Sequence, residues 1–188
     1  MRGDQVAIRA GTAADAEAAA ALVHRADVAR RGPSPQDELT RERSVRRLGE
    51  PSTFFVLAEA VPGTPGAGDG LVGVAAGLPG RAGGGVGDPI PRLCHLTMVA
   101  VHPGFWGRGL GGRLVDAILV EARRRGYAQA QLFTQTANHR ARALYSGRGF
   151  VATGQTSVDE IGDEILHYIR DLTDLPVSPV GADKRLDG

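Results

Sequence analysis

Several residue types and patterns are scarce in this 188-residue sequence, and each scarcity excludes a class of protein. Cys94 is the only cysteine, so the chain has neither an internal disulfide nor a cysteine-based zinc site. Lys184 is the only lysine, which excludes a Walker A loop because that loop needs Gly-Lys-Ser/Thr. No apolar run reaches the ~18 residues of a membrane span, and the N-terminus lacks a signal-peptide core. We therefore expect a cytoplasmic protein without a membrane partner.

Net charge is also small, at +1, which gives no general reason to expect a nucleic-acid partner. The charge is unevenly distributed, however. Residues 103–150 hold eight arginines against two acids, whereas residues 151–188 hold eight acids against three bases. A basic block followed by an acidic block predicts an anionic ligand at one place and favours a cationic one nearby.

Glycine is abundant, with 27 residues, and its placement is informative. The glycines have no period of three, which excludes collagen, and long apolar stretches argue against general disorder. Eleven glycines lie between residues 63 and 87, and five lie between residues 104 and 112. The stretch 79–91 (PGRAGGGVGDPIP) is expected to fall outside regular structure, as a disordered insertion in preference to a flap.

Hydrophobic periodicity predicts a mixed α/β domain over residues 1–172 and a flexible tail over residues 173–188. The predicted order is β, α, α, β, β, β, α, β, α, β, β. The predicted strands cover residues 6–9, 53–60, 71–78, 92–101, 130–134, 150–155 and 164–171. The predicted helices cover residues 12–29, 36–48, 110–125 and 138–147.

The turn HPGFWGRGLGG, residues 102–112, carries the strongest chemical signal. It connects the end of a strand to the start of an amphipathic helix, and its small residues let several backbone N–H groups converge on one point. The positive end of the helix dipole adds to this effect, and Arg108 and Arg113 would favour the same anion. The alternative is a plain flexible turn, but the glycines stop where the helix begins. The pattern therefore favours phosphate binding.

The same turn fits a nucleotide-binding fold less well. Gly107, Gly109 and Gly112 have the spacing G-x-G-x-x-G, but a dinucleotide fold needs these glycines directly after the strand. Here five residues, 102–106, intervene. The next predicted strand also lacks the acidic residue that would bind a ribose.

Two segments resemble motifs of the GNAT acyltransferases. LTMVAVHPGFWGRGLGGRLV, residues 96–115, resembles motif A, and NHRARALYSGRGF, residues 138–150, resembles motif B. The resemblance covers roughly residues 5–172 and implies a mixed central sheet with splayed central strands, flanked by helices. One residue departs from motif A, because Trp106 stands where Arg or Gln is usual.

The resemblance implies acetyl-CoA as cosubstrate and assigns residues to its binding. A strand segment would pair its backbone with the pantetheine arm, the glycine turn would hold the pyrophosphate, and a helix-capping residue would contact the pantetheine. Asn138, the last of these, is also a plain N-cap candidate. The implied donor residues are Val99, Ala100, Val101, Gly107, Arg108, Gly109, Leu110, Gly111, Gly112 and Asn138.

The resemblance also implies catalytic residues. Tyr145 matches the general acid that protonates the CoA thiolate or stabilises its charge. Some family members place a glutamate base where this chain has Phe133. Others place one at the position of His95, whose residue type has a suitable ordinary pKa. Glu59 and a chain of bound waters remain alternatives for the base.

A direct attack on the thioester fits better than a Cys94 intermediate. Cys94 and His95 are consecutive in a strand and should point to opposite faces. The remaining histidines show no metal-ligand pattern, so no metal is expected. A non-catalytic acyl-CoA-binding or sensing domain on the same fold is the alternative to an enzyme.

The acceptor is the least determined part. The resemblance implies that residues 26–42 and 157–163 shape its site, where Asp159, Glu160 and Asp163 would attract a cationic amine. A solvated acidic loop explains them equally well. Small amines and peptide N-termini both fit as acceptors, and a homodimer is an expectation from the family alone.

Overall fold

The computed structural model describes residues 6–68, 70–82, 87–159 and 162–177. Its seven-stranded sheet has the order β1-β2-β3-β4-β5-β7-β6. The strands are β1 (Val6–Ala10), β2 (Phe54–Ala60), β3 (Leu71–Arg81), β4 (Pro89–Val101), β5 (Gln129–Gln135), β6 (Val151–Val158) and β7 (Glu164–Asp171). The helices are α1 (Ala16–Arg31), α2 (Asp37–Leu48), α3 (Leu110–Arg124) and α4 (His139–Ser146), with short 3₁₀ turns η1 (Ala13–Asp15) and η3 (Pro103–Phe105). The predicted order of elements is confirmed.

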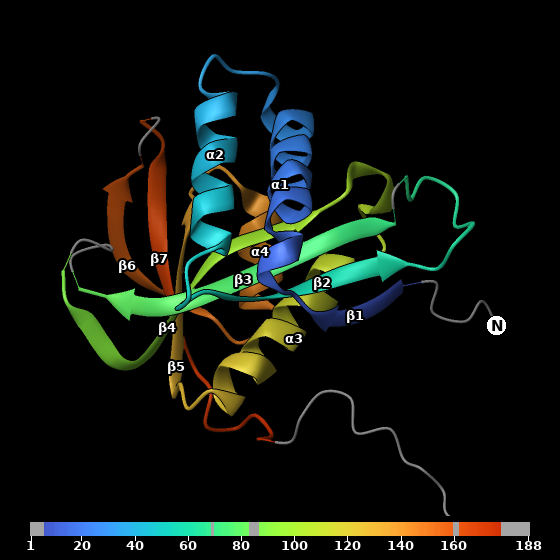
Figure 1. Ribbon diagram of the computed structural model, residues 1–188. Helices are drawn as coiled ribbons and strands as arrows, with labels where there is room; N and C mark the ends of the chain where they lie inside the picture. The colour runs from blue at the N-terminus through green and yellow to red at the C-terminus, as the bar shows by residue number, and fades with distance from the viewer. Residues whose placement is uncertain (1–5, 69, 83–86, 160–161, 178–188) are drawn as a thin grey trace, which may run out of the picture.

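The helices cover both faces of the sheet. Figure 1 shows α1 and α2 on one side and α3 on the other. Each face of the sheet has its own apolar cluster. Successive side chains of β2 point to opposite faces, so Phe54 and Val56 belong to one cluster and Phe55 and Leu57 belong to the other. The α3 side holds the larger cluster, which includes the fully buried face Leu114, Val115, Ile118, Leu119 and Ala122. The 3.6-residue spacing of these side chains is why this segment forms a helix on the sheet.

The centre of the sheet contains the predicted splay. Strands β4 and β5 are parallel and pair over Leu93–His95 and Gln129–Gln131. Within the described residues, the pairing stops there, although β4 continues to Val101 and β5 to Gln135. All other neighbouring strands are antiparallel. The expected GNAT-like mixed sheet with separated central strands is confirmed.

The prediction for residues 79–91 was wrong at both ends. Strand β3 extends to Arg81 and β4 begins at Pro89, and these two residues pair across the ladder. A register shift near Gly80 accommodates the prolines, which cannot donate to the ladder. Gly80 also permits close approach, because a Cβ there would lie 2.6 Å from Leu93 Cγ. Long-range pairing therefore orders both ends of a segment whose composition is typical of a loop. Residues 83–86, in the middle of the predicted insertion 79–91, lie outside the described residues.

The segment that follows β7 is held against the core at its start. Leu172 is fully buried, and its N–H donates to Ala128 O at 2.8 Å. Leu175 also packs against the larger cluster. Residues 178–188 lie outside the described residues, so the flexible tail from residue 173 stays a prediction.

Candidate functional site

The open edge of β4 is the first part of the site. His102 N–H donates to Val72 O at 2.9 Å, on the side of β3. Because backbone groups alternate in an antiparallel ladder, Ala100 also faces β3, whereas Val99 and Val101 direct their N–H and C=O groups toward the splay. Two of the three predicted pantetheine-pairing residues thus present backbone groups to the gap.

The glycine turn follows directly after this edge. Gly107 and Gly109 have φ values of 79° and 77°, a left-handed conformation that favours glycine. A Cβ built on either residue would meet nothing within 4 Å. The space beside both glycines is therefore open to a ligand, and residues 107–112 are called the glycine cradle below.

The N-terminus of α3 closes the cradle. Gly109 is the N-cap and brings no side chain to the helix end. The N–H groups of Leu110 and Gly111 lie in the first turn, where a helix offers no acceptor of its own. An anion placed above the turn would receive these donors and the favourable end of the helix dipole.

The next two glycines bring α3 against α4. A Cβ on Gly111 would lie 3.6 Å from Leu144 and 3.8 Å from Val101, which is ordinary contact. Gly112 is buried, and a Cβ there would lie 1.6 Å from Arg148 Nη2. Arg148 Nε donates to Gly112 O at 2.9 Å and lies 3.2 Å from Asp116 Oδ1. The two sequence motifs are thus joined by direct contact, and Arg148 is a residue that sequence reasoning missed.

The two arginines expected to attract an anion differ in placement. Arg108 is exposed beside the cradle, with its guanidinium 4.7 Å from the Phe105 ring centroid. Arg113 instead donates to Val6 O at 2.9 Å, which ties α3 to β1. Arg108 is therefore the better placed of the two for a phosphate.

Helix α4 carries two more predicted residues. Asn138 Oδ1 accepts from Ala141 N at 3.1 Å, so the plain N-cap role is present, and any pantetheine contact would use the Nδ2 group. The Tyr145 ring lies edge-on to Phe150 with centroids 5.8 Å apart. Burial raises the pKa of Tyr145 to about 12, so the phenol is protonated throughout the neutral range.

His95 lies at the vertex of the splay. It is the last β4 residue paired with β5, and its ring centroid lies 6.0 Å from that of Phe133. Its Nδ1 atom is buried without a hydrogen-bond partner in the described part of the chain. Burial, with smaller contributions from Arg47 and His167, lowers the pKa of His95 to about 4. The imidazole is neutral at pH 7 and has one ring nitrogen available.

His95 is linked across the sheet, through the Phe133 ring, to a group of hydrogen-bonded polar side chains that the sequence did not predict. The Phe133 ring lies 4.9 Å from the His167 ring. His167 contacts Gln131 Oε1 through Nε2 at 3.1 Å and Thr153 Oγ1 through Nδ1 at 2.9 Å. Gln131, Thr153 and His167 come from three different strands, β5, β6 and β7, so no local pattern could have indicated them.

The acidic loop between β6 and β7 contacts the end of β5. Gln135 Nε2 donates to Asp163 Oδ2 at 2.7 Å and to Asp159 Oδ2 at 3.3 Å. Gln135 Oε1 accepts from Arg30 Nη1 at 3.1 Å, at the end of α1. The two predicted acceptor segments are thus joined beyond the open end of the splay, while Glu160 lies outside the described residues.

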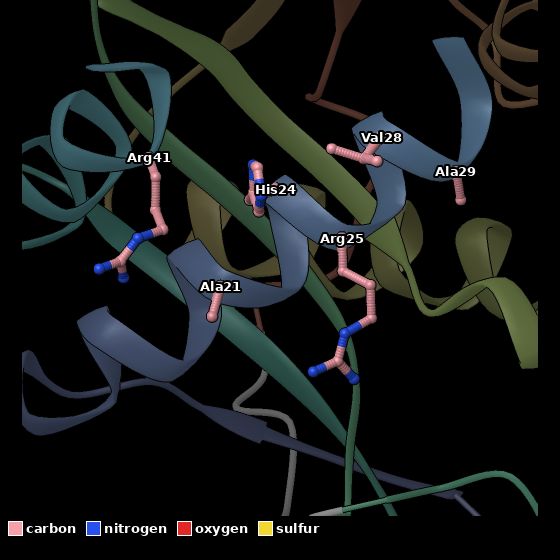
Figure 2. Close-up of a pocket in the computed structure, with 6 residues that line it drawn as sticks. All are labelled: Ala21, His24, Arg25, Val28, Ala29 and Arg41. Atoms are coloured by element: carbon pink, nitrogen blue, oxygen red, sulfur yellow. The ribbon is translucent and has the colours of Figure 1, made fainter. Parts of the chain in front are cut away.

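A surface hollow of about 600 Å³ lies between α1 and α2. Figure 2 shows its lining residues, Ala21, His24, Arg25, Val28, Ala29 and Arg41. Three of them fall within the predicted acceptor segment 26–42. No acidic side chain lines the hollow, so it does not match a cationic amine.

Two other candidates, Cys94 and Glu59, lie outside the candidate site. Cys94 is buried on the α3 side, and desolvation raises the pKa of its thiol to about 12. Glu59 on β2 forms an ion pair with Arg9 on β1 at 2.8 Å. These two strands lie at one edge of the sheet, separated from β5 by at least two other strands. Among the residues that the structure describes, no group of three or more His, Cys, Asp or Glu could hold a metal ion.

Most of the chain matches the model of a known protein family. The model of the acetyltransferase (GNAT) family matches residues 19–150. The chain belongs to this family. The match includes the β4 edge, the glycine turn and all of α4, which are the parts of this GNAT protein that make up the candidate site.

Curated relatives match this GNAT protein over short segments. Mycothiol acetyltransferase of Beutenbergia cavernae is 43% identical over 56 residues, which are 30% of this chain and 19% of the relative. N-acetyltransferase 8F1 of Rattus norvegicus is 36% identical over 90 residues, which are 47% of this chain and 38% of the relative. The chain thus spans less than two fifths of the length of either relative.

Solved structures share the fold over nearly the whole chain. The ribosomal-protein-S18-alanine N-acetyltransferase of Escherichia coli has a TM-score of 0.62 and 17% identity, covering 95% of this chain and 97% of its own. The PaiA N-acetyltransferase of Thermoplasma acidophilum, solved with coenzyme A, has a TM-score of 0.60 and 15% identity, covering 86% of this chain and 97% of its own.

In the described part of this GNAT protein, no helix is both long and apolar enough to cross a membrane.

Proposed function

We propose that this GNAT protein transfers an acetyl group from acetyl-CoA to a primary amine by direct attack in a ternary complex. One observation carries the proposal: β4 and β5 separate directly beyond His95, and the same β4 edge ends in the glycine cradle. A long acyl donor with a phosphate at one end and a thioester at the other fits this continuous path. A cytoplasmic location and a homodimer remain predictions.

The residues present suit a CoA-based donor. Gly107 and Gly109 leave open space over the N-terminus of α3, where the pyrophosphate would accept backbone N–H donors. Val99 and Val101 would pair with the pantetheine amides as a neighbouring strand does. When bound, the donor supplies the activated acyl carbonyl, and Asn138 at the start of α4 would help to orient its arm.

Tyr145 is proposed to assist departure of the sulfur. The amine nitrogen forms a bond to the acyl carbon, the C–S bond breaks, and the electron pair leaves on sulfur. A phenol with a pKa of about 12 is a weaker acid than a thiol, whose ordinary pKa is ~8.5. Tyr145 would therefore stabilise the thiolate mainly as a hydrogen-bond donor, and the proton lost by the amine restores the thiol.

His95 is proposed to receive that proton. Its neutral ring and unpartnered Nδ1 lie at the vertex of the splay, close to where the thioester would enter. Because its pKa is about 4, His95 is too weak a base to deprotonate a free ammonium ion. The acceptor would lose its first proton to solvent and attack as the neutral amine. His95 would then accept the second proton from the attacking nitrogen, directly or through a bound water, and pass it on to the thiolate.

The low pKa of His95 predicts a specific dependence of stability on pH. The unfolded histidine binds a proton near pH 6.5, whereas the folded one does so only near 4. Between these values the unfolded state binds more protons, so the free energy of unfolding falls with falling pH, by up to ~1.4 kcal/mol per unit. Urea unfolding of wild type and His95→Gln from pH 7 to pH 4 measures the difference. Equal slopes in the two proteins would show that His95 is not desolvated as described.

Asp163 is proposed to attract the cationic acceptor. Its carboxylate lies beside Gln135, at the end of β5 that points away from the paired part of the splay. Both solved relatives described above are N-acetyltransferases, which supports an amine acceptor without defining it.

Asp163→Asn should raise the KM for a cationic amine about two- to fivefold and leave the donor affinity unchanged, as expected for one exposed ion pair. Asp174→Asn is the matched control, because Asp174 follows the other end of β7, roughly 25 Å away along the strand. Steady-state kinetics at two salt concentrations measures both variants. An equal change in the two variants would remove Asp163 from the acceptor site.

Ligand specificity tests the donor assignment. Acetyl-CoA should raise the melting temperature of the protein at millimolar concentration, whereas NAD and ATP should not. A response to NAD or ATP equal to that of acetyl-CoA would point instead to a nucleotide-binding module.

A further inference from the structure

Trp106 is the only tryptophan in the sequence, and it connects the two walls of the donor site. Its indole Nε1–H donates to Val101 O at 2.7 Å. The Arg140 guanidinium lies over the same ring, 5.6 Å from its centroid. Trp106 belongs to the turn before α3, and Arg140 belongs to the first turn of α4.

The Val101 carbonyl is the significant partner. It points away from β3, toward the gap between β4 and β5, as the alternation of the ladder requires. A strand-like ligand added to this edge would use this carbonyl as an acceptor. The indole N–H therefore occupies the position at which an amide N–H of such a ligand would donate.

The surroundings of Trp106 allow it to leave this position. Phe105 is buried and anchors the turn, but the Trp106 side chain is at the surface, with 36% of the residue exposed. Gly107 follows at φ 79° with open space around it. The indole is held by one neutral hydrogen bond and one exposed cation–π contact, and Trp106 lies between the buried Phe105 and Gly107. Little free energy is therefore needed to move the indole away.

We propose that Trp106 is a latch on the donor site, held closed by its contacts with Val101 and Arg140 and displaced from the Val101 carbonyl when the pantetheine arm of the acyl donor binds. This inference rests on the proposed function, since it needs a CoA-type donor. It assigns a role to the one residue that departs from motif A. Displacing one neutral hydrogen bond reduces the apparent donor affinity about two- to tenfold.

The fluorescence of the single tryptophan reports directly on the latch. Acetyl-CoA should shift the emission maximum of wild type to longer wavelength and increase quenching by acrylamide, because the indole is released into water. The control ligand is 3′-phospho-ADP, which carries the phosphates and the adenine of the donor but has no pantetheine arm. It should leave the emission maximum unchanged.

Trp106→Phe tests the same latch by affinity. Phenylalanine keeps an aromatic ring for Arg140 but has no N–H for Val101 O, so acetyl-CoA should bind about two- to tenfold more tightly by calorimetry. The dissociation constant of 3′-phospho-ADP should be the same as in wild type. Thermal melting by circular dichroism shows that the variant is folded at the temperature of the titration.

The outcomes separate the two proposals. Acetyl-CoA binding to wild type without a change in emission or quenching overturns the latch and leaves the proposed function intact. Unchanged or weaker acetyl-CoA binding by Trp106→Phe also overturns the latch alone. If calorimetry detects no binding of acetyl-CoA to wild type, both proposals fail.

Discussion

Tyr145→Phe should lower kcat for acetyl transfer by about 10²- to 10⁴-fold and leave the dissociation constant of acetyl-CoA unchanged. The phenol has a pKa of about 12, so it is protonated throughout the neutral range and can donate to a departing thiolate. Phenylalanine keeps the edge-on contact with Phe150 and removes only the hydroxyl group. Release of free thiol, measured under saturating donor and amine, gives the rate.

Tyr127→Phe is the matched control for this variant. Tyr127 is also partly buried with a raised pKa, but it lies after the C-terminus of α3 and stacks on Phe54. This variant should retain the wild-type kcat. A Tyr145→Phe protein with an unchanged kcat would exclude Tyr145 as the proton or hydrogen-bond donor, whatever its affinity for acetyl-CoA.

Gly109→Ala should weaken acetyl-CoA binding about tenfold to a hundredfold, ~1.4–2.8 kcal/mol. Its Cβ would fill the open space over the N-terminus of α3, where the donor pyrophosphate is proposed to approach the backbone. Alanine at φ 77° is also strained, which should reduce the free energy of unfolding by ~1–2 kcal/mol. Calorimetry measures the first effect and urea unfolding the second.

Gly126 offers a control that separates strain from binding. It lies just beyond α3 at the opposite end from the cradle, has φ 91°, and a Cβ there would also meet nothing within 4 Å. Gly126→Ala should lose the same stability as Gly109→Ala and bind acetyl-CoA as wild type does. Equal affinities in the two variants would mean that the pyrophosphate does not lie over Gly109.

The sequence was sufficient for those features that short segments specify. The apolar spacing from Leu110 to Ala122 determines α3, and Asn138 begins α4 with the expected cap. Two motifs at family spacing indicated the splayed sheet, which β4 and β5 form. The roles of the site residues, Tyr145 and His95 among them, stay predictions.

Long-range contacts account for what the sequence did not predict. Gly112 has the spacing of a phosphate-binding glycine, but Arg148, 36 residues later, covers its Cα. Arg113 has the charge to attract a phosphate, but β1 provides Val6 O as its partner. His95 has an ordinary pKa near neutrality as a residue type, but burial at the vertex of the splay lowers it, with smaller contributions from Arg47 and His167. Each outcome depends on a neighbour that is distant in the chain.

Amine-dependent release of thiol from acetyl-CoA, followed by mass spectrometry of the amine, tests the central claim most directly. A panel of polyamines, aminoglycosides, amino acids and peptides with free N-termini covers the acceptor classes. At least one amine should release one CoA thiol for each acetyl group it gains, and Tyr145→Phe should largely lose this activity. Tight binding of acetyl-CoA with no amine-dependent release across the panel would contradict an enzyme and indicate an acyl-CoA-binding domain.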